Sequence, residues 1–81
     1  MDIKGKVAVV SGGASGMGLE IVKRLVSLGA KAAIFDMNAA AGEAAVAELG
    51  DAVMFADVNV TSEESVQAGV NATMAAFGAI H

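Results

Sequence analysis

The sequence predicts an α/β fold built on a doubly wound parallel sheet, of which the first β-α-β-α-β-α half is present. Three short apolar runs alternate with three segments of helical periodicity. Glycines stand near the end of each helical segment, and no proline or low-complexity tract interrupts the order. Because right-handed crossovers make such strands parallel, we expect the first two helices on one face of the sheet and the third on the other.

The first unit is a strand over residues 6–11, followed by a glycine-rich turn and a helix. The run KVAVVS is β-branched and apolar on both sides, which is typical of a buried parallel strand. In the helix, polar and apolar residues recur at helical spacing on opposite faces. The polar face holds Glu20, Lys23, Arg24 and Ser27, and the apolar face holds Ile21, Val22, Leu25 and Leu28. Gly29 is predicted to end this helix as its C′ residue.

The second unit repeats this pattern in a shorter segment. The run KAAIFD, residues 31–36, predicts a strand. Asn38 is suited to cap a helix over residues 39–49, and Gly50 is predicted to end it.

The third unit begins with AVMFADV, residues 52–58, which predicts a strand. Thr61 and Glu64 have the spacing of a capping box and are predicted to open the third helix. The apolar stripe expected on that helix consists of Val66, Val70, Met74 and Phe77, and Gly78 is predicted to close it. A fourth strand is the next expected element, and it should begin near residues 80–81.

The charge pattern argues against nucleic-acid and membrane partners. The net charge is −4, all five basic residues lie within residues 1–31, and residues 32–81 carry seven acids without Lys or Arg. Such a chain offers no basic surface for a polyanion. No apolar stretch approaches the ~20 residues that span a bilayer. Cysteine is absent and the single His stands last, so neither disulfides nor a metal site are expected. The expected location is the cytoplasm, with the mitochondrial matrix as the alternative.

Four of the ten glycines lie in SGGASGMG, residues 11–18, between the first strand and the first helix. The first N–H groups of a helix lack intrahelical partners and carry partial positive charge, so they can bind a phosphate. By analogy with the dinucleotide-binding fingerprint, Gly12 allows the tight turn, Gly16 the approach of a diphosphate, and Gly18 close packing of helix against strand. Ser15 could add a hydroxyl and Met17 an N–H. A plain turn is the alternative interpretation, and a P-loop is excluded because no Gly-Lys-Ser/Thr follows.

Asp36 is predicted to hold the adenosine ribose. It ends the second strand, 18 residues after Gly18, where a dinucleotide fold places the acid that accepts from the ribose hydroxyls. A carboxylate about 4 Å from a 2′-phosphate repels each unit of its charge by up to ~4 kcal/mol at an effective dielectric near 20. No Lys or Arg follows residue 31 to offset this repulsion, so the sequence predicts NAD rather than NADP. An ordinary helix cap or turn residue is the alternative role for Asp36.

Asp57 and Val58 end the third strand at the same carboxyl edge, where ligands of open α/β sheets bind. Asp57 could accept from the adenine amino group, and Val58 could pack on the ring. A simple turn-forming role for Asp57 stays open.

With these residues placed, the chain resembles the amino-terminal part of a short-chain dehydrogenase/reductase. That family's TGxxxGxG signature is matched by Ser11-Gly12-x-x-x-Gly16-x-Gly18, its strand-end acid by Asp36, and its Asp-Val pair by Asp57-Val58. The runs GGASGMGL, FADVNVTSEESVQ and AFGAIH are similar to the type II 3-hydroxyacyl-CoA dehydrogenase branch. The resemblance extends from about Lys4 to His81.

The resemblance implies a Rossmann-type fold, NAD as cofactor, a homotetramer, and reversible hydride transfer between NAD and an alcohol or ketone. It implies NAD contacts at Gly12, Ser15, Met17, Asp36, Asp57 and Val58. The family's catalytic Asn, Ser and Tyr-x-x-x-Lys cannot be placed here, because the chain contains no Tyr. No catalytic residue is therefore assigned, and His81 is expected to be a solvated terminal residue.

We interpret residues 1–81 as the amino-terminal, dinucleotide-binding half of a single Rossmann domain whose remainder lies outside this chain. The first strand would otherwise be an open apolar edge, and a domain of this size buries only about 60% of its unfolded surface. The leading functional hypothesis is the cofactor half of an NAD-dependent oxidoreductase acting on a 3-hydroxyacyl-CoA or hydroxysteroid-like substrate. The alternatives are a non-catalytic NAD-binding module or inactive relative, and a purely structural α/β unit.

Overall fold

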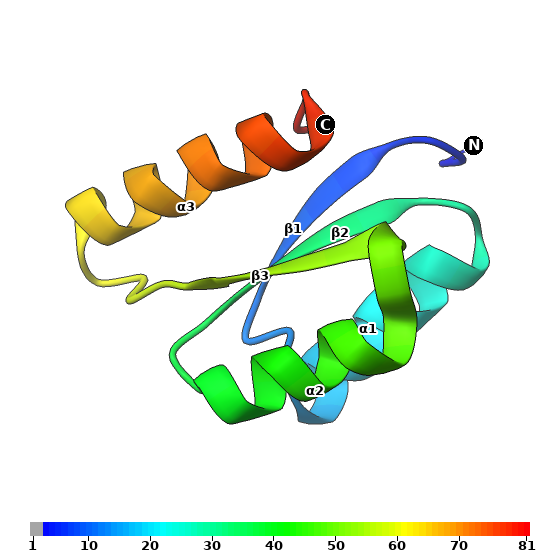
Figure 1. The fold of residues 1–81 in the computed structure, drawn as a ribbon, viewed down its shortest axis with the longest axis horizontal. Helices are drawn as coiled ribbons and strands as arrows, with labels where there is room; N and C mark the ends of the chain where they lie inside the picture. Colours follow the sequence, from blue (N-terminus) through cyan, green and yellow to red (C-terminus); the bar gives the residue numbers. More distant parts are fainter. Residues whose placement is uncertain (1–2) are drawn as a thin grey trace.

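The computed structural model describes residues 3–81 and contains the alternating strands and helices that the sequence predicts (Figure 1). The elements are β1 (Val7–Ser11), α1 (Gly16–Ser27), β2 (Lys31–Asp36), α2 (Ala39–Leu49), a short 3-10 turn (Gly50–Ala52), β3 (Val53–Asp57) and α3 (Glu63–Phe77). The predicted strand ranges are confirmed to within one residue at each end. None of the helices in the described range is long and apolar enough to cross a membrane.

The strands form one parallel sheet in the order β1-β2-β3, so β2 lies in the centre. In β2 the four residues from Ala32 to Phe35 are buried, which explains why this strand is apolar on both sides. The register pairs Ser11 with Phe35 and Asp36 with Asp57. The carboxyl ends of the strands therefore meet at one edge of the sheet, where β1 leads into α1, β2 into α2 and β3 into α3.

The two faces of the sheet are covered as predicted. Figure 1 shows α1 and α2 together on one face and α3 alone on the other. Ile34 of β2 packs with Val22 of α1 and Ala45 of α2 in one core cluster, whereas Ala33 and Phe35 pack toward α3. Successive residues of a strand point to opposite faces, so β2 supplies both cores from adjacent positions.

The buried face of α1 matches the predicted one in part, since Val22 is buried and Leu25 is half-buried. Val22 is fully buried, and its neighbours in the core are Leu19 and Val26. Ile21 and Leu28, which the sequence placed on the apolar face, are each 47% exposed. Apolar residues cover more than half of this helix, and periodicity alone does not say which part of so wide a stripe meets the sheet.

The start of α3 also differs from the prediction. Ser62, not Thr61, is the N-cap, and its side-chain oxygen accepts from the Ser65 N–H at 3.2 Å. The Thr61 hydroxyl instead donates to Asn59 Oδ1 at 2.7 Å, within the loop that follows β3. A cap binds the N–H three residues on, so moving the helix start by one residue replaces one hydroxyl with the other.

The buried stripe of α3 contains two residues that the apolar pattern did not include. Gly69 and Thr73 are buried, and the Thr73 hydroxyl is satisfied by donating to Gly69 O at 2.8 Å. Met74, predicted in the stripe, is 45% exposed. Gly78 closes the helix in the left-handed conformation, as predicted.

The outer edge of β1 contacts the last residue of the chain. The Val7 N–H donates to His81 Nδ1 at 2.9 Å, and the His81 N–H donates to Val7 O at 2.8 Å. His81 is exposed, but its ring is bonded to the backbone rather than only to solvent, which corrects the expectation of a purely solvated terminal residue. The chain thus returns to the side of β1 opposite β2, where a fourth strand is expected.

Candidate functional site at the carboxyl edge of the sheet

The turn between β1 and α1 depends on two glycines with positive φ. Gly12 has φ +67° and Gly16 has φ +57°, in the left-handed region that L side chains rarely adopt. The Gly12 N–H donates to Phe35 O at 2.8 Å, which fixes the start of the turn to β2. A Cβ built on Gly16 would meet no protein atom within 4 Å, so the space above this residue is open to a ligand.

Gly18 is required by a close contact inside the turn itself. A Cβ at this position would overlap the carbonyl oxygen of Gly12 and lie 2.7 Å from its carbonyl carbon. The first turn of α1 therefore packs against the Gly12 backbone, a closer partner than the strand that the fingerprint analogy indicated. Gly13, which the sequence analysis gave no role, is buried, and its Cβ would lie 3.1 Å from Val10 O.

The N-terminus of α1 differs from those of the other two helices. Ser15 is its N-cap, but no side chain in the described range caps the first turn, and that turn contains no acidic residue. By contrast, Asn38 caps α2 and Ser62 caps α3. Ser15, Gly16 and Met17 are exposed, and Met17 is 81% exposed. The α1 N–H groups are thus turned to solvent with a partial positive charge that favours an anion.

Asp36 lies beside this turn and is fixed by the main chain. Its Oδ2 accepts from the Ala14 N–H at 3.2 Å, and its Oδ1 accepts from the Asn38 N–H at 3.0 Å. An ionised carboxylate offers about four lone-pair sites, so two acceptor positions are left for other donors. The sequence did not predict the hydrogen bond from Ala14. Every residue except proline has a main-chain N–H, so the residue type of Ala14 does not mark it as the donor.

Asp57 and Val58 complete the edge on the β3 side. Asp57 is exposed and is the register partner of Asp36. Val58 donates its N–H to Asp36 O at 3.1 Å, and its side chain is only 2% exposed within the core under α3. Val58 is therefore almost wholly buried at this edge, and its contact with an adenine ring stays a prediction.

The structure gathers the ends of all three strands at this edge. Gly12 follows β1, Asp36 ends β2 and Asp57 ends β3, while Ser15, Gly16, Met17 and Gly18 form the start of α1. The edge combines unpaired N–H donors at the α1 side with two carboxylates at the β2 and β3 side. These N–H donors and carboxylate acceptors suit a ligand with an anionic group at one end and hydroxyl or amino donors at the other.

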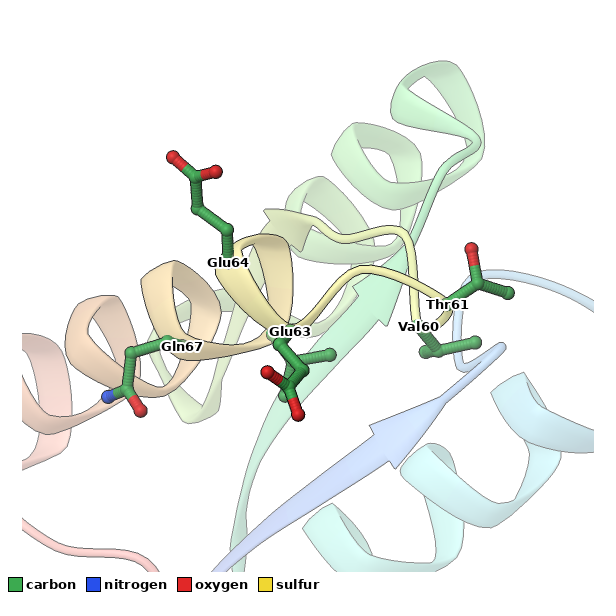
Figure 2. A pocket seen from close by; sticks show the side chains of 6 residues that line it. Val60, Thr61, Glu63, Glu64 and Gln67 are labelled. Atoms are coloured by element: carbon green, nitrogen blue, oxygen red, sulfur yellow. The ribbon is translucent and has the colours of Figure 1, made fainter.

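Two hollows on the surface are each lined by residues other than the predicted cofactor residues. The first, of about 600 Å³, is lined by Val60, Thr61, Glu63, Glu64, Val66 and Gln67 at the start of α3. Figure 2 shows its labelled side chains pointing in different directions, with Glu64 turned away from Val60 and Thr61. These polar groups do not converge on one ligand position.

The second hollow, of about 550 Å³, follows the outer edge of β1. It is lined by Ile3, Lys6, Val7, Ala8, Leu25, Ala30 and His81. It lies on β1, α1 and the end of the chain, away from the glycine turn. Within residues 3–81, no group of three or more potential metal-ligating side chains gathers at either hollow or elsewhere.

Comparisons with known proteins agree with this arrangement. A family model described as short chain dehydrogenase matches residues 6–81. The chain is 47% identical over 78 residues to the 3-hydroxyacyl-CoA dehydrogenase type-2 of Rattus norvegicus, covering 96% of this chain and 30% of that protein. It is 56% identical over 61 residues to the 3-beta-hydroxysteroid dehydrogenase of Comamonas testosteroni, covering 75% of this chain and 24% of that protein.

The fold also matches solved structures closely. A 3-ketoacyl-(acyl-carrier-protein) reductase from Brucella melitensis, crystallised with NADH, superposes with a TM-score of 0.93 at 36% identity. The match covers 96% of this chain and 32% of that one. The chain thus spans about a third or less of the length of the proteins it resembles.

Proposed function

The chain belongs to the short-chain dehydrogenase family, and from that premise we propose that it is the NAD-binding part of an oxidoreductase. The proposed reaction is reversible hydride transfer between NAD and an alcohol or ketone. The observation that carries the proposal is the uncapped N-terminus of α1 beside the Asp36 carboxylate, on adjacent strand ends.

The residues at the edge fit the two ends of a dinucleotide's adenosine diphosphate. The N–H groups at the start of α1 would bind the diphosphate, since Gly16 leaves the space above it open. Asp36 would accept from the ribose hydroxyls with the lone pairs that Ala14 and Asn38 leave free. Asp57 would accept from the adenine amino group. The nicotinamide supplies the hydride chemistry, and these residues bind and orient its carrier.

The preference for NAD over NADP rests on the charges around Asp36. Asp57 is its register partner, so a second carboxylate lies on the adjacent strand end. The nearest following side chains, Met37 and Asn38, are uncharged, and residues 32–81 contain neither Lys nor Arg. A 2′-phosphate here would meet two carboxylates, and residues 32–81 offer no Lys or Arg to offset their charge.

We propose an alcohol with the 3-hydroxyacyl-CoA pattern as the substrate of the whole enzyme, with a hydroxysteroid as the second candidate. The relatives of those names support both classes. The chain itself contains no tyrosine, so the proton-transfer group that the family resemblance implies is not among these residues. By itself the chain would act as a non-catalytic NAD-binding module. A homotetramer and a cytoplasmic location remain proposals that rest on the resemblance and the composition.

Isothermal titration of the chain with NAD, and with NADP as the comparison, tests the binding proposal. We expect NAD to bind and Gly16→Val to abolish binding, because the added side chain would fill the diphosphate space. A matched control is Gly50→Val, since Gly50 also has positive φ and open surroundings but lies before β3, at the opposite end of the sheet. Equal loss of NAD affinity in both variants would show that only folding had been perturbed and would contradict the proposal.

A further inference from the structure

Asp36 links the glycine turn to the segment between β2 and α2. Its Oδ2 accepts from the N–H of Ala14, 22 residues earlier, inside the glycine turn. Its Oδ1 accepts from the Asn38 N–H, just before α2. The carboxylate thereby connects the glycine turn to the end of β2 through main-chain groups alone.

We propose that Asp36 is a positioning residue for the diphosphate, in addition to its proposed contact with the ribose. Through Ala14 it holds the glycine turn in the shape that directs the first α1 N–H groups to one place. This inference rests on the proposed function, because the diphosphate is taken to bind at those N–H groups.

The turn requires such a support. Gly12 and Gly16 have positive φ, and glycine backbones lose more conformational freedom on ordering than any other residue. In the part of the chain that the structure describes, no side chain caps the first turn of α1. Ala14 itself is only 2% exposed, so its N–H needs a partner in the protein, and Asp36 is the partner that the structure provides.

Charge and positioning make opposite predictions for an anion that carries no ribose. If Asp36 acted only as a nearby negative charge, neutralising it would strengthen the binding of inorganic pyrophosphate. If it holds the turn, neutralising it weakens that binding. In Asp36→Asn the amide has one oxygen, so whichever way it is oriented its NH2 group faces one of the two N–H donors that Asp36 now satisfies.

Asp57→Asn is the matched control for charge. Asp57 is the register partner of Asp36 and ends the adjacent strand, so its substitution removes the same charge from a nearby position. Its side chain is exposed, and within residues 3–81 no main-chain N–H donates to it. We expect Asp57→Asn to bind pyrophosphate more tightly than the unsubstituted chain.

The experiment uses the ¹⁵N-labelled chain, titrated with inorganic pyrophosphate and followed at the amides of Ala14 and of the first turn of α1. We expect Asp36→Asn to bind pyrophosphate about fivefold more weakly, the typical effect of losing one hydrogen bond. Without ligand, we expect its Ala14 amide to exchange with solvent at least about fivefold faster. The Ile34 amide in the central strand, which reports on the whole fold, should change much less.

Each other outcome overturns the inference. Suppose that Asp36→Asn binds pyrophosphate at least as tightly as the unsubstituted chain and that its Ala14 amide is still protected. Asp36 would then act on the anion through its charge alone. Loss of protection by the same factor at Ala14 and Ile34 would mean that Asp36 supports the fold rather than the turn. The proposed function is tested separately: if the unsubstituted chain fails to bind NAD while Asp36→Asn still exposes Ala14 selectively, the binding proposal is wrong and the contact stands.

Discussion

Asp36 and Asp57 are register partners in the last pair of the β2–β3 ladder, so two carboxylates end adjacent strands at one edge of the sheet. Within residues 3–81, Asp36 is the one of the two that accepts from main-chain N–H groups, from Ala14 at 3.2 Å and from Asn38 at 3.0 Å. The pair makes the β2–β3 part of the edge negative, while the start of α1 makes the other part positive. This polarity underlies the expected choice between cofactors.

The first prediction concerns NAD and NADP. We expect the chain to bind NAD at least about tenfold more tightly than NADP. A quarter of the ~4 kcal/mol repulsion per unit charge, multiplied by the roughly 1.5 to 2 charges of a phosphate, is about 1.5–2 kcal/mol, and about 1.4 kcal/mol already corresponds to a tenfold difference in affinity. Asp36→Ala should narrow the ratio by weakening NAD about tenfold, the range of a hydrogen bond to a charged group, and by relieving NADP. Isothermal titration with both cofactors measures the two affinities. Equal affinities in the unsubstituted chain would refute the assignment.

The second prediction separates the two kinds of glycine in the turn. Gly18→Ala should destabilise the fold by about 1–3 kcal/mol, because its Cβ meets the Gly12 backbone, which cannot rotate away as a side chain could. Gly16→Ala should cost about 1 kcal/mol, since it strains φ but meets no atom. Urea denaturation of both variants gives the two values. A larger loss for Gly16→Ala would show that conformation, rather than contact, governs this turn.

The third prediction tests which hydroxyl caps α3. Ser62→Ala should lower the free energy of unfolding by about 1 kcal/mol, because the Ser65 N–H loses its acceptor. Thr61→Ala should change it by less than about 0.5 kcal/mol, since its exposed hydroxyl bonds only within the loop. The two substitutions are matched neighbours in the same denaturation experiment. A larger loss for Thr61→Ala than for Ser62→Ala would instead support Thr61 as the cap of α3, as the sequence predicted.

Much of the fold could be predicted because its boundaries are marked by residues with special backbone preferences. Gly29, Gly50 and Gly78 have positive φ at the ends of the three helices, so the sequence indicates those ends directly. The apolar run KAAIFD likewise predicted a strand, although its place at the centre of this sheet was not predicted. The positions of Gly12, Asp36 and Asp57 followed from the strand ends, since parallel strands bring their carboxyl ends to one edge.

What the sequence could not predict depends on contacts rather than on residue type. The predicted apolar face of α1 included Val22, but its apolar residues cover too wide an arc to say that Val26, rather than Ile21 and Leu28, would join Val22 in the core. The hydrogen bond from Ala14 to Asp36 is donated by a main-chain N–H, and the side chain of the donor residue gives no sign of it. Gly69 lies in the buried stripe of α3 because Phe35 and Val58 fill the space opposite it, which no helical pattern reveals.

The fourth prediction uses Gly69 to connect the packing of α3 with the cofactor edge. A Cβ here would lie 2.7 Å from Val58 Cγ2 and 2.9 Å from Phe35 Cζ, so Gly69→Ala must displace at least one of them. We expect a loss of about 1–3 kcal/mol in the free energy of unfolding. Val58 also donates its N–H to Asp36 O, so its displacement should weaken NAD binding as well.

The exposed neighbour Ala68 provides the control, because Ala68→Ser on the solvent face of α3 should change stability by no more than about 0.5 kcal/mol. Denaturation and NAD titration of both variants give the two readouts. If Gly69→Ala is destabilised yet binds NAD normally, Val58 or Phe35 moves on the α3 side without shifting the strand ends that form the proposed site. Joint loss of stability and affinity, absent in Ala68→Ser, would instead show that the close contact of α3 with Val58 helps to set the position of the strand ends.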